Sequence, residues 1–133
     1  MKRLAILGST GSIGANTLAV VDRHCDRFQV VALSADRQVD RLFEQCSRYR
    51  PRFAAMADAA AADQLRRKVR DSGLDCEVLS GARGLEQIAA APEVDAVMAA
   101  IVGSAGLRST LAAARAGKQL LLANKEALVM AGG

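Results

Sequence analysis

Short apolar runs alternate along the chain with longer stretches in which apolar residues recur at helical spacing. The runs predict strands and the periodic stretches predict helices. The clearest run is FQVVAL at 28–33, which is continuous and β-branched like a strand buried on both faces. The expected strands are 4–7, 28–33, 53–56, 77–79, 96–102 and 119–122, and the expected helices are 12–23, 39–46, 59–70, 85–91, 107–116 and one that begins at Asn124.

This order of elements predicts an α/β fold. Strands and helices that alternate along the whole chain are typical of a Rossmann-type fold, in which a doubly wound, mostly parallel sheet has helices on both faces. A chain of 133 residues fits one such domain over 1–133. The last expected helix has only just begun when the sequence stops at Gly133. We therefore expect the chain to be a piece of a longer protein.

Composition narrows the class of protein. Hydrophobic residues make up 51% and charged residues 24%, as in a soluble globular domain. The first apolar run ends at Gly8, short of the about 7 to 15 residues of a signal peptide. No run approaches the about 20 apolar residues of a membrane span. Cys25, Cys46 and Cys76 are widely spaced and lack a C-x-x-C pair, as reduced thiols do in a cytosolic protein. We expect a cytoplasmic protein with no membrane partner.

The positive charge indicates anionic small molecules more than nucleic acid. The formal net charge is +4 and the pI about 9.3. Basic residues are scattered, with one short cluster at 66–68 and acids between them. Such a pattern is typical of solvated helix faces, so we expect no nucleic-acid partner. A modest positive field would still favour anionic ligands.

The stretch GSTGSIG at 8–14 is the first candidate site. It joins the first expected strand to the first expected helix and carries Gly8, Gly11 and Gly14. At such a junction the backbone N–H groups and the positive end of the helix face a pyrophosphate. Thr10 and Ser12 add hydroxyl donors. The alternative interpretation is a purely structural strand-to-helix turn.

The end of the second expected strand bears on the choice of cofactor. NAD-binding relatives of this architecture carry an acid about 20 residues beyond the glycines, which binds the ribose 2′-OH. That count reaches Ser34, which has no carboxylate. Arg37, followed by Gln38, offers a cation for a 2′-phosphate, although Asp36 is an unfavourable neighbour. The pattern favours NADP over NAD; the alternative for Arg37 is a solvated loop cation.

Two later stretches are further candidates. Gly103–Gly106 (GSAG) follows the strand at 96–102, and its small residues would admit a nicotinamide ribose or form a plain loop. Asn124, Lys125 and Glu126 follow a leucine-rich strand and combine an amide, a cation and an anion at one corner. As a pattern they fit a functional site and a helix cap with first-turn charges equally well. No metal-ligand spacing and no nucleophile–base pair is evident, and His24 stands alone.

GSTGSIG and LLANKEALV together are similar to the N-terminal part of the 1-deoxy-D-xylulose 5-phosphate reductoisomerase family. This family comprises NADPH-dependent enzymes of non-mevalonate isoprenoid biosynthesis. The likeness runs through the whole chain, with KRLAILGSTGSIG, VVALSA, EVLSG, VDAVMAAIVGSAGL and LLLANKEALV in the family's order. Two such motifs at this separation are specific, and they favour a functional role for the 124–126 corner.

The resemblance implies a role for each candidate residue. Residues 10–13 would hold the pyrophosphate region of NADPH, and residues 36–38 would receive the adenosine 2′-phosphate. The family commonly has Gly-Lys-Asn at the second segment, so Arg37 preserves the charge and Asp36 departs from the pattern. The implied cofactor contacts are Thr10, Gly11, Ser12, Ile13, Asp36, Arg37, Gln38, Asn124 and Glu126, and the implied substrate contact is Lys125.

The resemblance also implies what the chain lacks. The family converts 1-deoxy-D-xylulose 5-phosphate to 2-C-methyl-D-erythritol 4-phosphate by a metal-assisted rearrangement followed by hydride transfer. Its Mg²⁺ or Mn²⁺ site lies in a catalytic domain beyond residue 133, so we expect no catalytic or metal-binding residue here and no turnover by this chain alone. The intact enzyme would be a homodimer. Two alternatives are a non-catalytic dinucleotide-binding module and another NADP-dependent reductase such as a semialdehyde dehydrogenase, whose catalytic cysteine motif none of the three cysteines matches.

Overall fold

The described strands form one sheet of seven in the order β4-β3-β2-β1-β5-β6-β7. The computed structural model describes residues 2–24, 26–99, 111–123 and 128–131. Strands β1 to β6 run parallel, and β7 pairs antiparallel with β6. The strands are β1 Lys2–Leu7, β2 Phe28–Ala35, β3 Phe53–Met56, β4 Glu77–Ser80, β5 Ala96–Ala99, β6 Gln119–Ala123 and β7 Leu128–Ala131.

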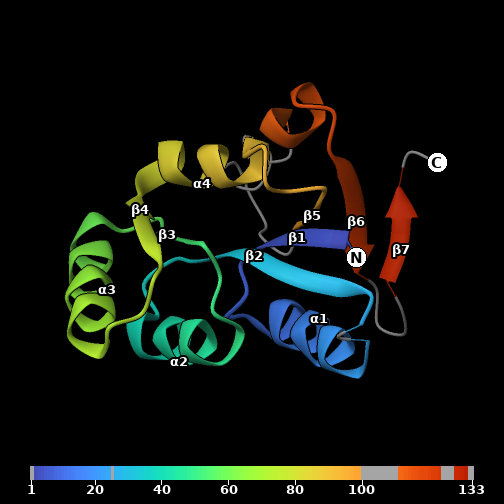
Figure 1. Ribbon diagram of the computed structural model, residues 1–133. Helices are drawn as coiled ribbons and strands as arrows, with labels where there is room; N and C mark the ends of the chain where they lie inside the picture. Colours follow the sequence, from blue (N-terminus) through green and yellow to red (C-terminus); the bar gives the residue numbers. More distant parts are fainter. Residues whose placement is uncertain (1, 25, 100–110, 124–127, 132–133) are drawn as a thin grey trace.

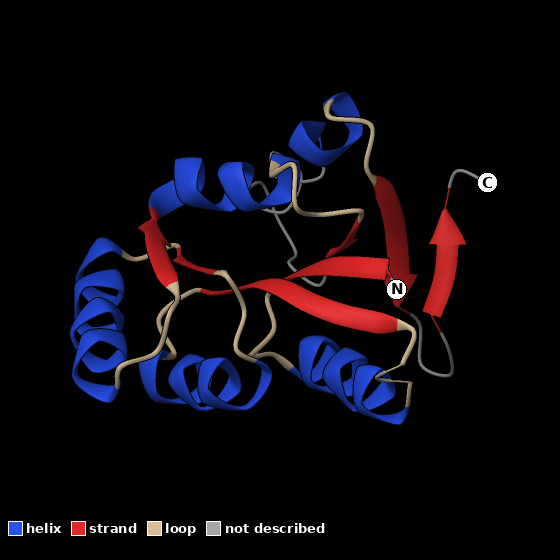
Figure 2. Cartoon of the chain, in the orientation of Figure 1, coloured by secondary structure: helices blue, strands red, loops and turns tan. Residues whose placement is uncertain are grey.

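Helices cover both faces of the sheet, as the sequence predicts for a Rossmann-type fold (Figure 1). The helices are α1 Ser12–Arg23, α2 Val39–Tyr49, α3 Ala59–Ser72 and α4 Gly81–Ala90. Helices α1, α2 and α3 lie below the sheet in Figures 1 and 2, whereas α4 and the helical residues 111–115 lie above it. No helix in the described ranges is long and apolar enough to cross a membrane.

Two apolar clusters hold these layers together, and β1 contributes to both. Leu4 and Ile6 pack into the cluster formed with α1, α2 and α3, whereas Ala5 and Leu7 pack into the cluster formed with α4. All four side chains are fully buried. This alternation follows from the period of two in a strand, and it explains why a strand covered on both faces is apolar at every position.

The boundaries differ from the predicted ones where capping decides them. Helix α2 continues one turn past the expected end, to a left-handed C-cap at Arg50 that precedes Pro51. Helix α4 begins at Gly81, four residues before the apolar periodicity starts at Leu85. Apart from Tyr49, both extensions consist of polar or small residues, which an apolar pattern does not register.

The predicted helix from Asn124 is wrong for the last described residues. Leu128–Ala131 is a strand, and its backbone pairs with β6 from Leu120 to Ala123. A short apolar run fits a helix and a buried strand equally well, so periodicity alone cannot separate them. Here pairing with the open edge of β6 satisfies backbone groups that this edge would otherwise leave unpaired.

The strand order places β1 at the point where the connections reverse direction. From β1 the chain moves to β2, β3 and β4 on one side, and β5 and β6 continue on the other. In open parallel sheets a crevice forms outside the carboxyl ends of the strands at this switch point. The segment that follows Leu7 at the end of β1 therefore begins at the position where such folds bind ligands.

Candidate dinucleotide-binding site

The glycine loop turns sharply after β1 and leads directly into α1. Gly8 has a φ of +80°, which glycine adopts without strain, and its carbonyl accepts the N–H of Gly11 at 3.2 Å. Gly11 is the N-cap of α1 in an extended conformation, and its carbonyl accepts the N–H of Ala15 at 2.8 Å. The predicted strand–loop–helix arrangement is confirmed.

Gly14 lets α1 pack against the loop. A Cβ atom at this position would lie 2.3 Å from the Gly8 carbonyl oxygen and 2.5 Å from the Ser9 Cα atom. Both distances are far below any contact that a real side chain makes, and both neighbours are backbone atoms. The third glycine of the motif is thus required by close packing between helix and loop.

The N-terminus of α1 is open to an anion. The first N–H groups of a helix have no intrahelical acceptor, and they carry the positive end of the helix dipole. Gly11 has no side chain to cap them, and the first turn of α1 contains no acidic residue. Gly11 is exposed and Thr10 is partly exposed. This end of the helix has the geometry and the charge to bind a phosphate group.

Ser34 stands where NAD-binding relatives carry an acid, and here it is hydrogen-bonded to the glycine loop. Its hydroxyl accepts the N–H of Gly8 at 2.9 Å, and its carbonyl accepts the N–H of Ser9 at 2.8 Å. Ser9 and Ser34 are both fully buried (0% exposed). Ser34 therefore faces the glycine loop and supports it from below, and sequence reasoning identified the residue without its role.

Residues 36–38 lie at the carboxyl end of β2, the strand next to β1. The Asp36 carbonyl accepts the N–H of Asp58, and the Arg37 carbonyl accepts the N–H of Val39 at 2.9 Å, which forms a tight turn into α2. The side chains of Asp36, Arg37 and Gln38 are all exposed. Within the described ranges none of the three makes a side-chain hydrogen bond or ion pair, so the Arg37 guanidinium is available to an anion.

The structure thus brings two of the predicted segments together and leaves two outside its described residues. Segments 8–14 and 36–38 share the carboxyl edge of the sheet, and the Ser34 contacts connect them. The GSAG stretch at 103–106 and the corner formed by Asn124, Lys125 and Glu126 lie outside the described residues.

The described cysteines do not resemble an activated nucleophile at this edge. Cys46 is a fully buried residue of α2, and its hydrogen bond with the Cys76 thiol, together with burial, raises its pKa. A buried thiol of raised pKa stays protonated and unreactive. Cys76 precedes β4 and lies at the amino end of the sheet. In the described part of the chain no cluster of three or more His, Cys, Asp or Glu residues is arranged to hold a metal ion.

An open depression of about 410 Å³ lies at the opposite end of β2. Phe28 and Val30, at the start of that strand, line it together with Val21, Asp22, Arg48 and Tyr49. The Asp22 carboxylate accepts hydrogen bonds from Arg48 and from the Tyr49 hydroxyl, both at 2.9 Å. The charges of Asp22 and Arg48 therefore pair with each other. No residue of the glycine loop lines the depression.

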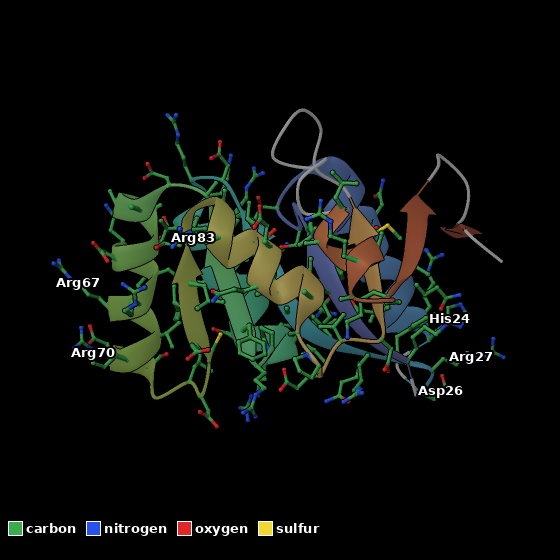
Figure 3. The ribbon with its side chains drawn as sticks, turned by 90° about the horizontal axis from the view of Figure 1, so that it is seen from above. His24, Asp26, Arg27, Arg67, Arg70 and Arg83 are labelled. Atoms are coloured by element: carbon green, nitrogen blue, oxygen red, sulfur yellow. The ribbon has the colours of Figure 1, made fainter. Side chains whose placement is uncertain are left out.

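Basic side chains are spread over the surface rather than gathered on one face. Figure 3 shows Arg67 and Arg70 projecting from α3 at one end of the molecule, and His24 and Arg27 at the other. Arg66 pairs with Asp63 at 2.7 Å, and Lys68 pairs with Asp40 at 3.3 Å. This distribution is the one expected for solvated helix faces.

A family model, that of 1-deoxy-D-xylulose 5-phosphate reductoisomerase, matches residues 4–132. A reductoisomerase of Methylococcus capsulatus is 65% identical over 99% of this chain and 34% of its own length. One of Nitrosomonas eutropha is 61% identical over 99% of this chain and 32% of its own length. The chain therefore spans about a third of the length of these curated relatives.

Solved structures agree in fold. A crystal structure of DOX-P reductoisomerase in complex with NADPH, fosmidomycin and magnesium has a TM-score of 0.89 at 49% identity, over 95% of this chain and 31% of that one. The enzyme from Zymomonas mobilis in complex with NADPH has a TM-score of 0.84 at 42% identity, over 94% of this chain and 32% of that one. These matches confirm the predicted Rossmann-type fold.

Proposed function

This chain belongs to the 1-deoxy-D-xylulose 5-phosphate reductoisomerase family, and from that premise we propose that residues 1–133 are the NADPH-binding domain of a protein with that activity. The observation that carries the proposal is the open N-terminus of α1 at the switch point of the sheet, where Gly14 of the helix packs so closely on the preceding loop that no side chain fits. Relatives of the same fold are described in complex with NADPH, which supports the choice of ligand.

The glycine loop binds the pyrophosphate in this proposal. Backbone N–H groups of Thr10, Gly11, Ser12 and Ile13 lie at the entry to α1, where the helix dipole favours negative charge. Charge-assisted hydrogen bonds from backbone N–H groups to phosphate oxygens are among the stronger ones in proteins. These residues orient the cofactor and take no part in the chemistry.

Arg37 binds the adenosine 2′-phosphate and provides the preference for NADPH over NADH. Its guanidinium is exposed and has no described partner, and the position that the count from the glycines reaches is the buried Ser34, which has no carboxylate for a ribose 2′-OH. Gln38 adds an amide donor. Asp36 remains a cofactor contact in this proposal, and because its carboxylate opposes a phosphate there, we expect it to lower the affinity.

Asn124 and Glu126 contact the cofactor and Lys125 contacts the sugar-phosphate substrate in the same proposal, on the strength of the family match across residues 4–132. NADPH supplies the hydride when it is bound. We expect the divalent ion, Mg²⁺ or Mn²⁺, to be held by residues outside this chain, as the resemblance to the family implies. The full-length protein acts in the cytoplasm as a homodimer, in non-mevalonate isoprenoid biosynthesis.

Titration with NADPH and NADH tests the cofactor assignment. The chain should bind NADPH at least tenfold more tightly than NADH, as measured by isothermal titration calorimetry. Arg37→Ala should reduce the NADPH affinity about 10- to 100-fold, because a hydrogen bond to a charged group contributes about 1.5–3 kcal/mol. It should leave the NADH affinity unchanged. Arg41→Ala removes an exposed cation of α2 and serves as the control. Equal affinities for the two nucleotides would refute the role of Arg37.

Activity distinguishes the proposal from a non-catalytic module and from another reductase. A protein of the relatives' full length that carries this chain should convert 1-deoxy-D-xylulose 5-phosphate with consumption of NADPH and should require a divalent ion. The 133-residue chain alone should bind NADPH without turnover. Binding without activity in the full-length protein would indicate a module, and reduction of an acyl phosphate instead would indicate a semialdehyde dehydrogenase.

A further inference from the structure

A buried polar cluster lies directly beneath the glycine loop, and its members come from three different segments. Ser9 belongs to the loop, Ser34 to β2, and Gln45 to the middle of α2. The two serines are fully buried and Gln45 is half-buried. Polar groups are rare in such surroundings unless they are hydrogen-bonded, so their contacts indicate what the cluster does.

The Gln45 carboxamide makes two hydrogen bonds to the same residue. The Ser9 hydroxyl donates to Gln45 Oε1 at 2.6 Å, and Gln45 Nε2 donates to the Ser9 carbonyl at 2.8 Å. The Ser9 hydroxyl also lies 3.2 Å from the Ser34 carbonyl. A hydroxyl has one proton to donate. Because its distance is shorter, Gln45 Oε1 is a better acceptor for that proton than the Ser34 carbonyl. Gln45 thus uses its acceptor and its donor to fix one loop residue.

These contacts determine the path of the loop. Ser9 is held at its N–H by the Ser34 carbonyl, and at its carbonyl and hydroxyl by Gln45. Gly8 is held at its N–H by the Ser34 hydroxyl. The chain then enters the turn at Thr10 and Gly11, so the direction of the following N–H groups depends on how Ser9 is oriented. Loss of Gln45 would leave two buried polar groups of Ser9 without that partner.

We propose that Gln45 is a positioning residue for dinucleotide binding, which orients the phosphate-binding N–H groups of the glycine loop through Ser9. Gln45 lies beneath the loop and acts through Ser9, without contact to the cofactor. The proposal rests on the proposed function, because it assumes that the loop binds a dinucleotide. It requires a side chain that both accepts and donates at this position.

That requirement makes Gln45→Glu a sharp test. An ionised carboxylate can accept the hydrogen bond from the Ser9 hydroxyl. It has no proton to donate to the Ser9 carbonyl, so the second hydrogen bond is lost. A protonated carboxyl group has one acceptor and one donor, so it reproduces the carboxamide. Partial burial raises the pKa of a carboxyl group, which brings this protonation into an accessible range. The defect should therefore be present at pH 8 and be corrected towards pH 5.

The experiment measures the dissociation constant of NADP⁺, which is stable in mild acid, in a protein of the relatives' full length that carries this chain. Gln45→Met removes both hydrogen bonds at nearly constant length and should raise the constant about tenfold at every pH. Gln45→Glu should raise it about tenfold at pH 8 and less than threefold at pH 5, as a ratio to wild type. The ratio cancels titration of the ligand. Glu44→Gln changes an exposed neighbour on α2 and should have no effect.

The outcomes separate this proposal from the one on which it rests. Wild-type affinity for NADP⁺ in the Gln45→Met variant, or in the Gln45→Glu variant at pH 8, would overturn the positioning role alone. No binding by the wild type would overturn the proposed function and this role with it. A purely structural role would lower the urea midpoint of both variants without the pH-dependent recovery of affinity.

Discussion

Helices α1 and α3 both begin at the carboxyl ends of parallel strands, but their first turns are capped differently. Helix α3 has Asp58 as its N-cap, and the carboxylate accepts the N–H of Ala61 at 2.9 Å. Helix α1 has Gly11 as its N-cap and no acid in its first turn. The start of α3 is capped by the side chain of Asp58, whereas the start of α1 has no side-chain cap, and in our proposal it binds an external anion.

The difference has an energetic cost that other contacts offset. Relative to the glycine N-cap of α1, an N-cap side chain typically contributes a few tenths of a kcal/mol, and α1 forgoes this contribution. Helix α1 is held instead by the close approach of Gly14 to Gly8 and by the polar cluster of Ser9, Ser34 and Gln45. The contacts that hold the start of α1 are thus made by Gly8, Ser9 and Gly14, and they do not occupy the first N–H groups of the helix.

Gly14→Ala should have the largest effect of these substitutions, because it disrupts the packing of α1 against the glycine loop. The new methyl group would overlap backbone atoms of Gly8 and Ser9, so α1 must move away from the loop. We expect the free energy of unfolding to fall by about 1–3 kcal/mol, as in other overpacked sites, and NADPH binding to be lost. Urea unfolding followed by circular dichroism, and calorimetric titration, measure the two effects.

Gly11→Ala is the matched control for that variant. A Cβ atom at Gly11 has only the Gly8 oxygen nearby, at 3.6 Å, which is an ordinary contact. We expect a change in stability of less than about 1 kcal/mol. Equal stability of the two alanine variants would contradict the packing role of Gly14.

Gly11→Asp should convert the start of α1 into one like that of α3. The φ of −76° at Gly11 suits any residue, and the new carboxylate can accept N–H groups of the first turn. We expect stability to stay constant or to rise by about 0.5 kcal/mol, while NADPH affinity falls at least tenfold through repulsion of the pyrophosphate. Gly11→Asn adds the same cap without the charge and should reduce affinity less. An identical loss in both variants would mean that charge at this position is unimportant.

Asp58→Ala should affect α3 and leave the candidate site intact. Loss of the cap should reduce the free energy of unfolding by about 1 kcal/mol. The backbone contact from Asp58 to Asp36 remains, so NADPH affinity should stay within about twofold of wild type. Asp58→Asn keeps an oxygen acceptor and should restore most of the stability. A large fall in NADPH affinity on removal of the Asp58 carboxylate would show that the two helix starts are coupled.

Asp95 directly precedes β5, at the amino ends of the parallel strands. Its substitution should have the smallest effect on stability. Hydrogen bonds from the Arg3 side chain and then from the Arg3 N–H hold the pKa of Asp95 at about 2, below its ordinary 3.8. A carboxyl group whose pKa is lowered by folding stabilises the protein above its ordinary pKa, and this stabilisation is lost as the pH falls from about 4 to about 2. Asp95→Asn should thus lower the urea midpoint modestly at pH 5, and the difference from wild type should shrink at pH 3. A constant difference would contradict the assignment, and NADPH binding should not change.

The parts of the site that could be predicted from the sequence are those that adjacent residues encode. The glycines mark a strand-to-helix turn by their spacing and by the apolar run before them, and Arg37 follows at a fixed interval beyond. The structure places both segments at one edge of the sheet. Ser9 and Gln45 could not be found in this way, because they are 36 positions apart and each is a common polar residue in its own segment.

The alternation of strands and helices and the strand-to-helix turn at the glycines could be read from the sequence alone, because apolar periodicity and turn formation depend on neighbours a few residues away. The tertiary structure decided the strand order, the antiparallel direction of Leu128–Ala131 and the partners of Ser9. These depend on hydrogen-bonding groups that meet only after the chain has folded, so the same short apolar run can become a helix or a strand, and a serine beside the glycines can be solvated or buried.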